Sequence, residues 1–177
     1  ADGLGLAIEQ NYVARSNLRF DISNVLNDVI NHLTQEASEH KVKLILQEDI
    51  SGQIQGDKSA IQLALQQLIG NAIKYSYSDR DINITVRNEG DQIVISISNE
   101  GIGLPKGREA VKMFDFGVRS KLAKERHVNG SGIGLYTSRK IAIAHSGRLW
   151  HQQDGARTIF CLALPPAEEK KPRIKRR

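Results

Sequence analysis

The chain has 177 residues, of which 40% are hydrophobic and 25% are charged, and its formal net charge is +5 at pH 7. This composition predicts one soluble globular domain with a real core, and the sequence contains neither a run of about eighteen apolar residues nor a charged-then-apolar signal segment. The charge does not indicate nucleic acid binding, because it lies in the tail: from residue 168 onward, six residues are basic and two are acidic.

The N-terminal third of the sequence predicts a helix followed by a strand. Residues 1–17 are interpreted as a linker or the remnant of an upstream helix. Residues 21–41 carry apolar side chains at three-four spacing, which predicts an amphipathic helix. Residues 42–49 alternate apolar and polar side chains, as a half-buried strand does.

The middle of the sequence predicts a second helix and a hairpin. Asp57 is the expected N-cap of a helix over residues 58–75, whose apolar residues again follow three-four spacing. Two strands follow at residues 82–88 and 92–99. The short Glu-Gly-Asp connection between them predicts an antiparallel hairpin.

One helix and two strands are predicted after a long irregular stretch. The helix opens at the glycines of residues 130–134, and Gly147 is interpreted as its C′ glycine. The strands lie at residues 147–153 and 157–165, and Cys161 in the second is expected to be an inert buried thiol. Residues 167–177 are expected to form a basic, disordered tail. Helices and paired strands in this irregular alternation indicate an α+β fold, with helices layered on one face of a mixed sheet.

Three polar side chains share one face of the second predicted helix. Gln67, Asn71 and Lys74 follow three-four spacing, so two amides and an amine lie opposite the apolar stripe. Taken alone, such residues are more often ordinary solvent-facing side chains than parts of a site.

Two glycine-bearing turns stand out in the second half of the chain. In the first glycine turn, residues 99–103, Gly101 and Gly103 would let the backbone approach a flat ligand closely, although a lone G-x-G is more often a simple turn. The second glycine turn, residues 130–134, opens a helix and matches neither the dinucleotide-binding fingerprint nor the P-loop. Successive backbone N–H groups at such a helix N-terminus form a cradle for an anion.

Five segments occur in the order and spacing of one protein family: QQLIGNAIKYS, SNEGIGLP, MFDFGVRS, NGSGIGLYTSRKIAIAHSG and RTIFCLALP. They resemble the N box, first glycine box, F box, second glycine box and closing strand of the ATP-binding catalytic domain of sensor histidine kinases. These domains belong to the GHKL superfamily of gyrase, heat-shock chaperone, histidine kinase and mismatch-repair ATPases. The resemblance implies a two-layer α/β sandwich over residues 18–166, with a mixed, mostly antiparallel sheet.

The resemblance also implies contacts with ATP and Mg²⁺. Asn71 would bind the magnesium ion and Lys74 would meet a phosphate, which makes these two the expected catalytic residues. Tyr75 would pack near the adenine, and residues 119–129 would form the mobile ATP lid. The implied nucleotide-binding residues are Asn71, Lys74, Tyr75, Asn99, Gly101, Gly103, Arg119, Lys121, Gly130, Ser131, Gly132, Gly134, Leu135 and Thr158. Phe114 and Phe116 are lid anchors, plain core residues, or both.

Two positions depart from the family pattern. Asn99 stands where the family usually has an aspartate that accepts a hydrogen bond from the adenine amino group. An amide oxygen can still accept that bond, but it gives up charge assistance worth about 1 kcal/mol, and the amide could rotate to donate instead. Thr158 could share this contact through a water. Gln67 stands where the hydrolysing branches have a glutamate, so steady ATP hydrolysis is not expected.

No histidine of the chain is followed by an acidic residue, as the phosphoacceptor of these kinases typically is. The resemblance therefore implies the ATP-binding catalytic domain of a two-component sensor histidine kinase that transfers the γ-phosphoryl group to a histidine outside this chain. A phosphoacceptor domain and a response regulator are the expected partners, and nucleic acid is not. The expected location is cytoplasmic, with any membrane attachment through regions missing from the chain.

Two alternatives stay open. The substitution at Asn99 is compatible with a degenerate nucleotide-sensing or interaction module without kinase activity. An autonomous ATPase is disfavoured by Gln67 and by the short chain.

Overall fold

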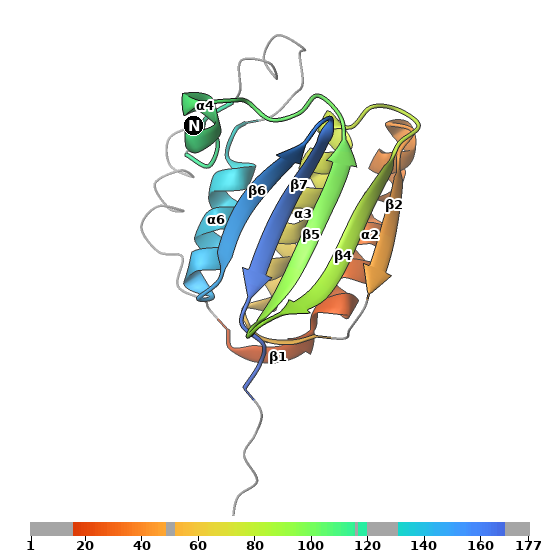
Figure 1. Cartoon of the computed structure of the whole chain (residues 1–177). Coiled ribbons are helices and arrows are strands. Elements are labelled where there is room, and N and C mark those ends of the chain that lie inside the picture. The colour runs from red at the N-terminus through yellow and green to blue at the C-terminus, as the bar shows by residue number, and fades with distance from the viewer. Residues whose placement is uncertain (1–15, 49–51, 116, 120–130, 169–177) are drawn as a thin grey trace, which may run out of the picture.

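The computed structural model describes residues 16–48, 52–115, 117–119 and 131–168. Within them, a five-stranded sheet is covered by helices on one face, so the domain has two layers (Figure 1). The strands lie in the order β2 (Lys43–Glu48), β4 (Asp81–Glu89), β5 (Gln92–Glu100), β7 (Arg157–Leu164) and β6 (Arg148–Asp154). β2 runs parallel to β4, and the other neighbouring pairs are antiparallel. The predicted α+β fold and its mixed, mostly antiparallel sheet are confirmed.

The helix layer consists of α2 (Ile22–Glu39), α3 (Lys58–Tyr75) and α6 (Gly134–Ala144) (Figure 1). α3 has the predicted bounds, and the Asp57 carboxylate caps it by accepting a hydrogen bond from the Ala60 N–H (3.2 Å). α2 ends two residues earlier than predicted. After it the chain turns back toward β2 through Lys41, whose φ of 56° is incompatible with a continued helix.

The core fills the space between the helices and the sheet. α3 lies in the middle and packs against both α2 and α6. Core side chains with no exposed surface include Ile22, Val25, Leu26, Ile61, Leu65, Leu68, Ile69, Ile82, Ile84, Ile95 and Ile97. Burial of each such side chain stabilises the fold by about 1.5–3 kcal/mol, which holds α3 in one orientation. Among the described residues, no helix has the length and apolar character needed to cross a membrane.

A small second sheet was not predicted. β1 (Leu18–Asp21) pairs antiparallel with β3 (Gln53–Gly56), and each strand has only four residues. The Ala167 N–H donates to the Gln53 carbonyl oxygen (2.6 Å), which ties the C-terminal end of the described chain to β3. A short helix, α4 (Arg108–Lys112), lies in the stretch expected to be irregular. Residues 1–15 and residues 169–177 of the expected tail lie outside the described residues.

The interpretation of Gly147 as the C′ glycine of α6 is wrong. The C′ position is Ser146, which has a φ of 56°. Its N–H donates to the Ile143 carbonyl oxygen (3.0 Å), and the Gly147 N–H donates to that of Ala142 (2.8 Å), which is the Schellman arrangement. Position 147 needs glycine for another reason, because a Cβ there would collide with the Ala163 carbonyl oxygen of β7.

Cys161 lies on the face of the sheet opposite the helices. Its side chain is only 4% exposed and is 3.5 Å from the Ser96 hydroxyl. Burial raises the pKa of the Cys161 thiol, so the reactive thiolate is scarce at neutral pH. The prediction of a buried thiol is confirmed.

Candidate functional site

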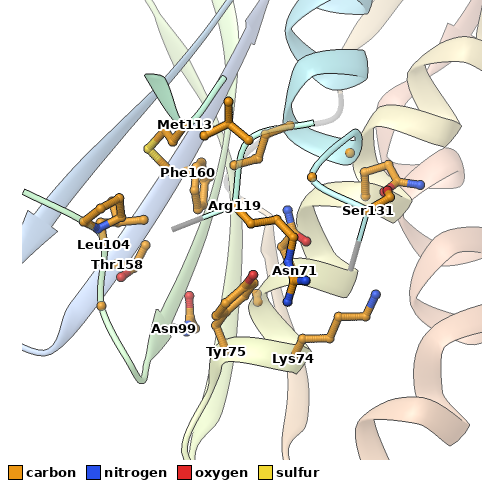
Figure 2. A pocket seen from close by; sticks show the side chains of 18 residues that line it. Asn71, Lys74, Tyr75, Asn99, Leu104, Met113, Arg119, Ser131, Thr158 and Phe160 are labelled. Carbon is orange, nitrogen blue, oxygen red and sulfur yellow. The ribbon is translucent and has the colours of Figure 1, made fainter. Parts of the chain in front are cut away.

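A cleft opens where the C-terminal half of α3 meets the ends of β5 and β7 and the start of α6 (Figure 2). The space inside it, with the open solvent at its mouth included, is about 930 Å³. Its lining residues are Gln67, Asn71, Ala72, Lys74, Tyr75, Asn99, Gly103, Leu104, Pro105, Met113, Val118, Arg119, Ser131, Gly132, Gly134, Leu135, Thr158 and Phe160. Of the predicted nucleotide-binding residues, Gly101 does not line the cleft, and Lys121 and Gly130 lie outside the described residues.

The polar face of α3 is directed into this cleft. Gln67 and Asn71 are half-buried and Lys74 is exposed, and all three line it. Figure 2 shows Asn71, Lys74 and Tyr75 together at its α3 wall. Burial raises the pKa of the Tyr75 phenol, and the positive charge of Arg119 partly offsets the rise. The helix thus supplies amide, amine and phenol groups to one cavity.

The first glycine turn closes one end of the cleft. Asn99 pairs with Thr158 across β5 and β7, and the two residues are 4% and 5% exposed. Gly101 faces away from the cleft, toward the end of α3. A side chain there would collide with the Tyr75 carbonyl oxygen, which accepts a hydrogen bond from the Ile102 N–H (3.0 Å). Gly101 is therefore a glycine because the turn packs on α3, which differs from the expected approach to a ligand.

Gln153 on β6 supports the same turn and was missed by the sequence analysis. Its Oε1 accepts hydrogen bonds from the Leu104 N–H (3.1 Å) and from the Thr158 hydroxyl (3.0 Å). Its Nε2 donates to the Gly155 carbonyl oxygen (2.6 Å). An exposed glutamine near a strand end carries no distinctive sequence pattern, so only the three-dimensional arrangement reveals this role.

The second glycine turn packs closely on neighbouring segments. Gly132 has a φ of 73°, and a Cβ on it would lie 2.7 Å from both the Gly117 carbonyl carbon and the Val118 carbonyl oxygen. A Cβ on Gly134 would meet only the flexible end of the Gln67 side chain, which can move aside. Gly132 therefore allows two backbone segments to approach each other, and room for phosphates at this turn stays a prediction.

The start of α6 is suited to an anion. Among the described residues, no side chain caps this helix at Ile133. The Ser131 hydroxyl accepts a hydrogen bond from the Ile133 N–H (3.3 Å). The N–H groups of Gly134 and Leu135, which line the cleft, have no carbonyl partner within their own helix and can therefore bind water or a ligand there. Lys74 and Arg119 add positive charge to the same cavity. This end of the cleft therefore favours a negatively charged ligand group.

Phe114 of the predicted F box is buried in an aromatic cluster next to the cleft. Its ring centroid is 5.7 Å from that of His151 and 6.4 Å from that of Phe160, and the Arg139 guanidinium lies 5.7 Å from it. Burial lowers the pKa of His151. Phe114 is thus a core residue that joins α6 to the β6–β7 pair, while Phe116 lies outside the described residues.

The donor set suits magnesium better than a metal that needs an all-protein cage. Within the described ranges, no group of three His, Cys, Asp or Glu side chains could hold a metal ion. An ion in the cleft would instead depend on the Asn71 amide oxygen, on oxygens of a bound ligand and on water. Mg²⁺ accepts such a shell, because it prefers oxygen and keeps several waters.

Comparison with protein families gives a match over residues 56–168 to the model described as histidine kinase-, DNA gyrase B-, and HSP90-like ATPase. The sensor histidine kinase WalK of Bacillus subtilis is 32% identical over 140 residues, which cover 77% of this chain and 22% of WalK. The sensor-like histidine kinase SenX3 of Mycolicibacterium smegmatis is 27% identical over 147 residues, which cover 82% of this chain and 38% of SenX3. The chain thus spans well under half of these relatives.

Solved structures show the same fold. The histidine kinase AdeS of Acinetobacter baumannii superposes with a TM-score of 0.73 at 21% identity, covering 90% of this chain and 72% of the AdeS chain. Full-length ShkA, whose structure is a complex with AMPPNP, gives a TM-score of 0.78 at 19% identity and covers 94% of this chain and 35% of its own. At these identities the likeness concerns the architecture alone.

Proposed function

Because this chain belongs to the histidine kinase-, DNA gyrase B- and HSP90-like ATPase family, we propose that its cleft binds Mg-ATP and presents the γ-phosphate to a histidine outside the chain. The observation that carries the proposal is the convergence of three groups of residues, from four segments of the chain, on one cavity. These are the Asn71 and Lys74 face of α3, the Asn99 and Thr158 pair, and the second glycine turn. Each supplies the chemistry that a different part of ATP requires.

The base would lie at the end of the cleft formed by Asn99 and Thr158. These are its buried polar groups, while Tyr75, Leu104 and Phe160 give it flat and apolar walls. A nucleobase needs this combination of stacking surface and a few directed hydrogen bonds.

The triphosphate would extend from there toward the start of α6. The backbone N–H groups of Gly134 and Leu135 would bind phosphate oxygens, and Lys74 and Arg119 would neutralise part of the charge. Asn71 would hold the magnesium ion together with phosphate oxygens and water. When bound, the ion supplies further neutralisation of the phosphate charge.

The chain's own part in the reaction would be positioning and charge stabilisation. Phosphoryl transfer has little covalent chemistry for the protein to perform, so aligned groups and fixed charges supply most of the rate. Gln67 lines the cleft beside Gly134, but its amide cannot take a proton from water. The acceptor would instead be an imidazole nitrogen, which forms the new bond to phosphorus as ADP leaves.

The remaining components of such a kinase would lie outside this chain. The relatives named above are sensor histidine kinases, and the chain matches only 22% and 38% of their lengths. A histidine-bearing domain would supply the acceptor, and a response regulator would receive the phosphoryl group. The domain would work in the cytoplasm.

Calorimetry tests the proposal directly. The purified chain should bind ATP more tightly with Mg²⁺ than without it, and Asn71→Ala should lose that magnesium-dependent gain. Gln66→Ala is the matched control, because Gln66 lies on α3 but does not line the cleft. Wild-type protein that binds no ATP would overturn the proposal, as would an Asn71→Ala titration that matches wild type with and without the metal.

A second measurement tests the direction of transfer. Radiolabelled ATP should leave no acid-labile phosphate on the chain alone, and labelling should appear when a histidine-bearing helical hairpin is added in trans. Labelling of the isolated chain would contradict an acceptor outside it.

A further inference from the structure

The side chain of Gln153 has its orientation fixed by two backbone groups. A backbone N–H can only donate, so the atom 3.1 Å from the Leu104 nitrogen must be the amide oxygen. A backbone carbonyl can only accept, so the atom 2.6 Å from the Gly155 oxygen must be the amide nitrogen. Neither partner can exchange roles, and the amide therefore cannot flip without losing both bonds.

This fixed amide determines what the Thr158 hydroxyl can do. Gln153 Oε1 lies 3.0 Å from Thr158 Oγ1, and an amide oxygen only accepts. The single hydroxyl proton of Thr158 must therefore point at Gln153. Thr158 lines the cleft, and its hydroxyl oxygen can only accept hydrogen bonds there.

The orientation of the Thr158 hydroxyl also limits the orientation of the Asn99 amide. Asn99 pairs with Thr158 across β5 and β7 and is 4% exposed. If the Asn99 oxygen faced Thr158, two acceptors would oppose each other. The favoured orientation turns the Asn99 nitrogen toward Thr158, with one water between the two side chains. The Asn99 oxygen is then left to accept a hydrogen bond from the base.

We infer that Gln153 is a positioning residue that sets base selectivity through Thr158 and Asn99. The inference rests on the proposed nucleotide site and adds its selectivity: the cleft prefers a base with an exocyclic amine, such as adenine, over one with a carbonyl at that place, such as guanine. Gln153 thereby restricts rotation of the Asn99 side-chain amide.

The test compares ATP and GTP affinities by calorimetry on the full chain. Gln153→Met keeps the side-chain length but removes the acceptor, so the Thr158 proton becomes free to turn into the cleft. The ratio of ATP to GTP affinity should fall about threefold to fivefold, the size expected for one neutral hydrogen bond. Gln152→Met is the matched control, because Gln152 is the exposed neighbour on the opposite face of β6, and its ratio should equal that of wild type.

Two further variants show whether Gln153 acts through the hydroxyl. Gln153→Glu keeps an acceptor for the Thr158 hydroxyl but loses the donor to the Gly155 carbonyl oxygen, so its ratio should lie between those of wild type and Gln153→Met. Thr158→Val should lower the ratio by itself, and adding Gln153→Met to it should change the ratio no further. A general loosening of the turn would lower the affinities for ATP and GTP alike and would leave their ratio unchanged.

The outcomes separate this inference from the proposed function. If wild type binds ATP but Gln153→Met leaves the ratio unchanged or raises it, the role of Gln153 is overturned while the site stands. The role is also overturned if Gln153→Met lowers the ratio equally in the Thr158→Val background. If wild type binds neither nucleotide, the proposed function itself is overturned, and the inference with it.

Discussion

The two glycine turns flank one cleft and look alike in sequence, yet they are held differently. The first is tied on both sides by backbone hydrogen bonds: the Ile102 N–H donates to the Tyr75 carbonyl oxygen (3.0 Å), and the Gly101 N–H donates to that of Ala156 (3.2 Å). The second approaches its neighbours through Gly132, which packs on the backbone of residues 117 and 118.

The same G-x-G pattern therefore serves two purposes in this protein. At the first turn, glycine lets a strand end join the end of α3 and the β6–β7 hairpin, so it is part of the fold. At the second turn, glycine shapes a surface at the start of α6, where a ligand anion would bind. Substitutions at the first turn should therefore mainly cost stability, and substitutions at the second should mainly cost binding.

The largest effect is expected for Gly101→Ala. The new Cβ would collide with the Tyr75 carbonyl oxygen and lie 2.7 Å from its carbon, and neither is a flexible side-chain end. The free energy of unfolding should fall by about 3 kcal/mol, at the upper end for overpacking, as measured by urea denaturation. Gly70→Ala in α3 is the control, because nothing lies within 4 Å of its Cβ, and it should be neutral or slightly stabilising. Equal stability of Gly101→Ala and wild type would show that the first turn is not part of the fold's support.

Gly132→Val should have its main effect on nucleotide binding. A residue with a side chain is strained by about 1–2 kcal/mol at positive φ, and the collision with residues 117 and 118 would displace the turn. ATP affinity should fall by on the order of 100-fold, about 2.7 kcal/mol, in calorimetry, with a smaller loss of unfolding free energy than for Gly101→Ala.

The control for this variant is Gly117→Ala. Gly117 has a φ of 70° but no atom within 4 Å of its Cβ, so it isolates strain from collision. Gly117→Ala should lower ATP affinity much less than Gly132→Val does. If Gly132→Val lowered stability as much as Gly101→Ala and left ATP affinity intact, the comparison of the two turns would be reversed.

Elements with long periodic patterns could be predicted from the sequence. α3 follows its apolar stripe over 18 residues and begins at its expected cap. The β4–β5 hairpin likewise follows from its alternation and its turn. β1 and β3 have four residues each, which is too short for a period to stand out, and they are paired across more than thirty intervening residues.

The polar face of α3 in the cleft could also be predicted, because helical spacing determines which side chains lie together. The roles of Gly101 and Gln153 could not. Gln153 binds a backbone N–H that is 49 residues away in the chain, so its partner is set by the sheet order and not by local pattern. The predicted C′ position of α6 is wrong by one residue because Ser146 adopts the positive φ that glycine usually takes, while glycine at 147 is required by β7.

A smaller effect is expected for Asn99→Asp at the base end of the cleft. A carboxylate would accept the bond from the adenine amino group with charge assistance, and its nearly complete burial would offset part of the gain. ATP affinity should rise by a factor of several, about 1 kcal/mol, and the ratio of ATP to GTP affinity should rise with it because a carboxylate repels the carbonyl oxygen of guanine. If neither quantity changes, Asn99 does not face the base. If wild type binds no nucleotide while the variant binds well, the natural domain is a degenerate module.

The smallest effect is expected at the aromatic contact that joins the two sides of the cleft, where Phe114 packs on His151. Burial lowers the pKa of His151 in the folded state, so as pH falls the unfolded chain takes up this proton first. The stability that the neutral imidazole contributes is complete above its ordinary pKa of about 6.5 and is lost as pH falls through that value toward the lowered one. Urea denaturation between about pH 7.5 and about pH 5 should therefore show a smaller loss for His151→Phe and His151→Gln than for wild type, by less than about 1 kcal/mol because the imidazole is only half-buried. Equal losses in all three proteins would show that His151 takes up its proton without disturbing Phe114, and the two sides of the cleft would then be joined by packing that is insensitive to charge.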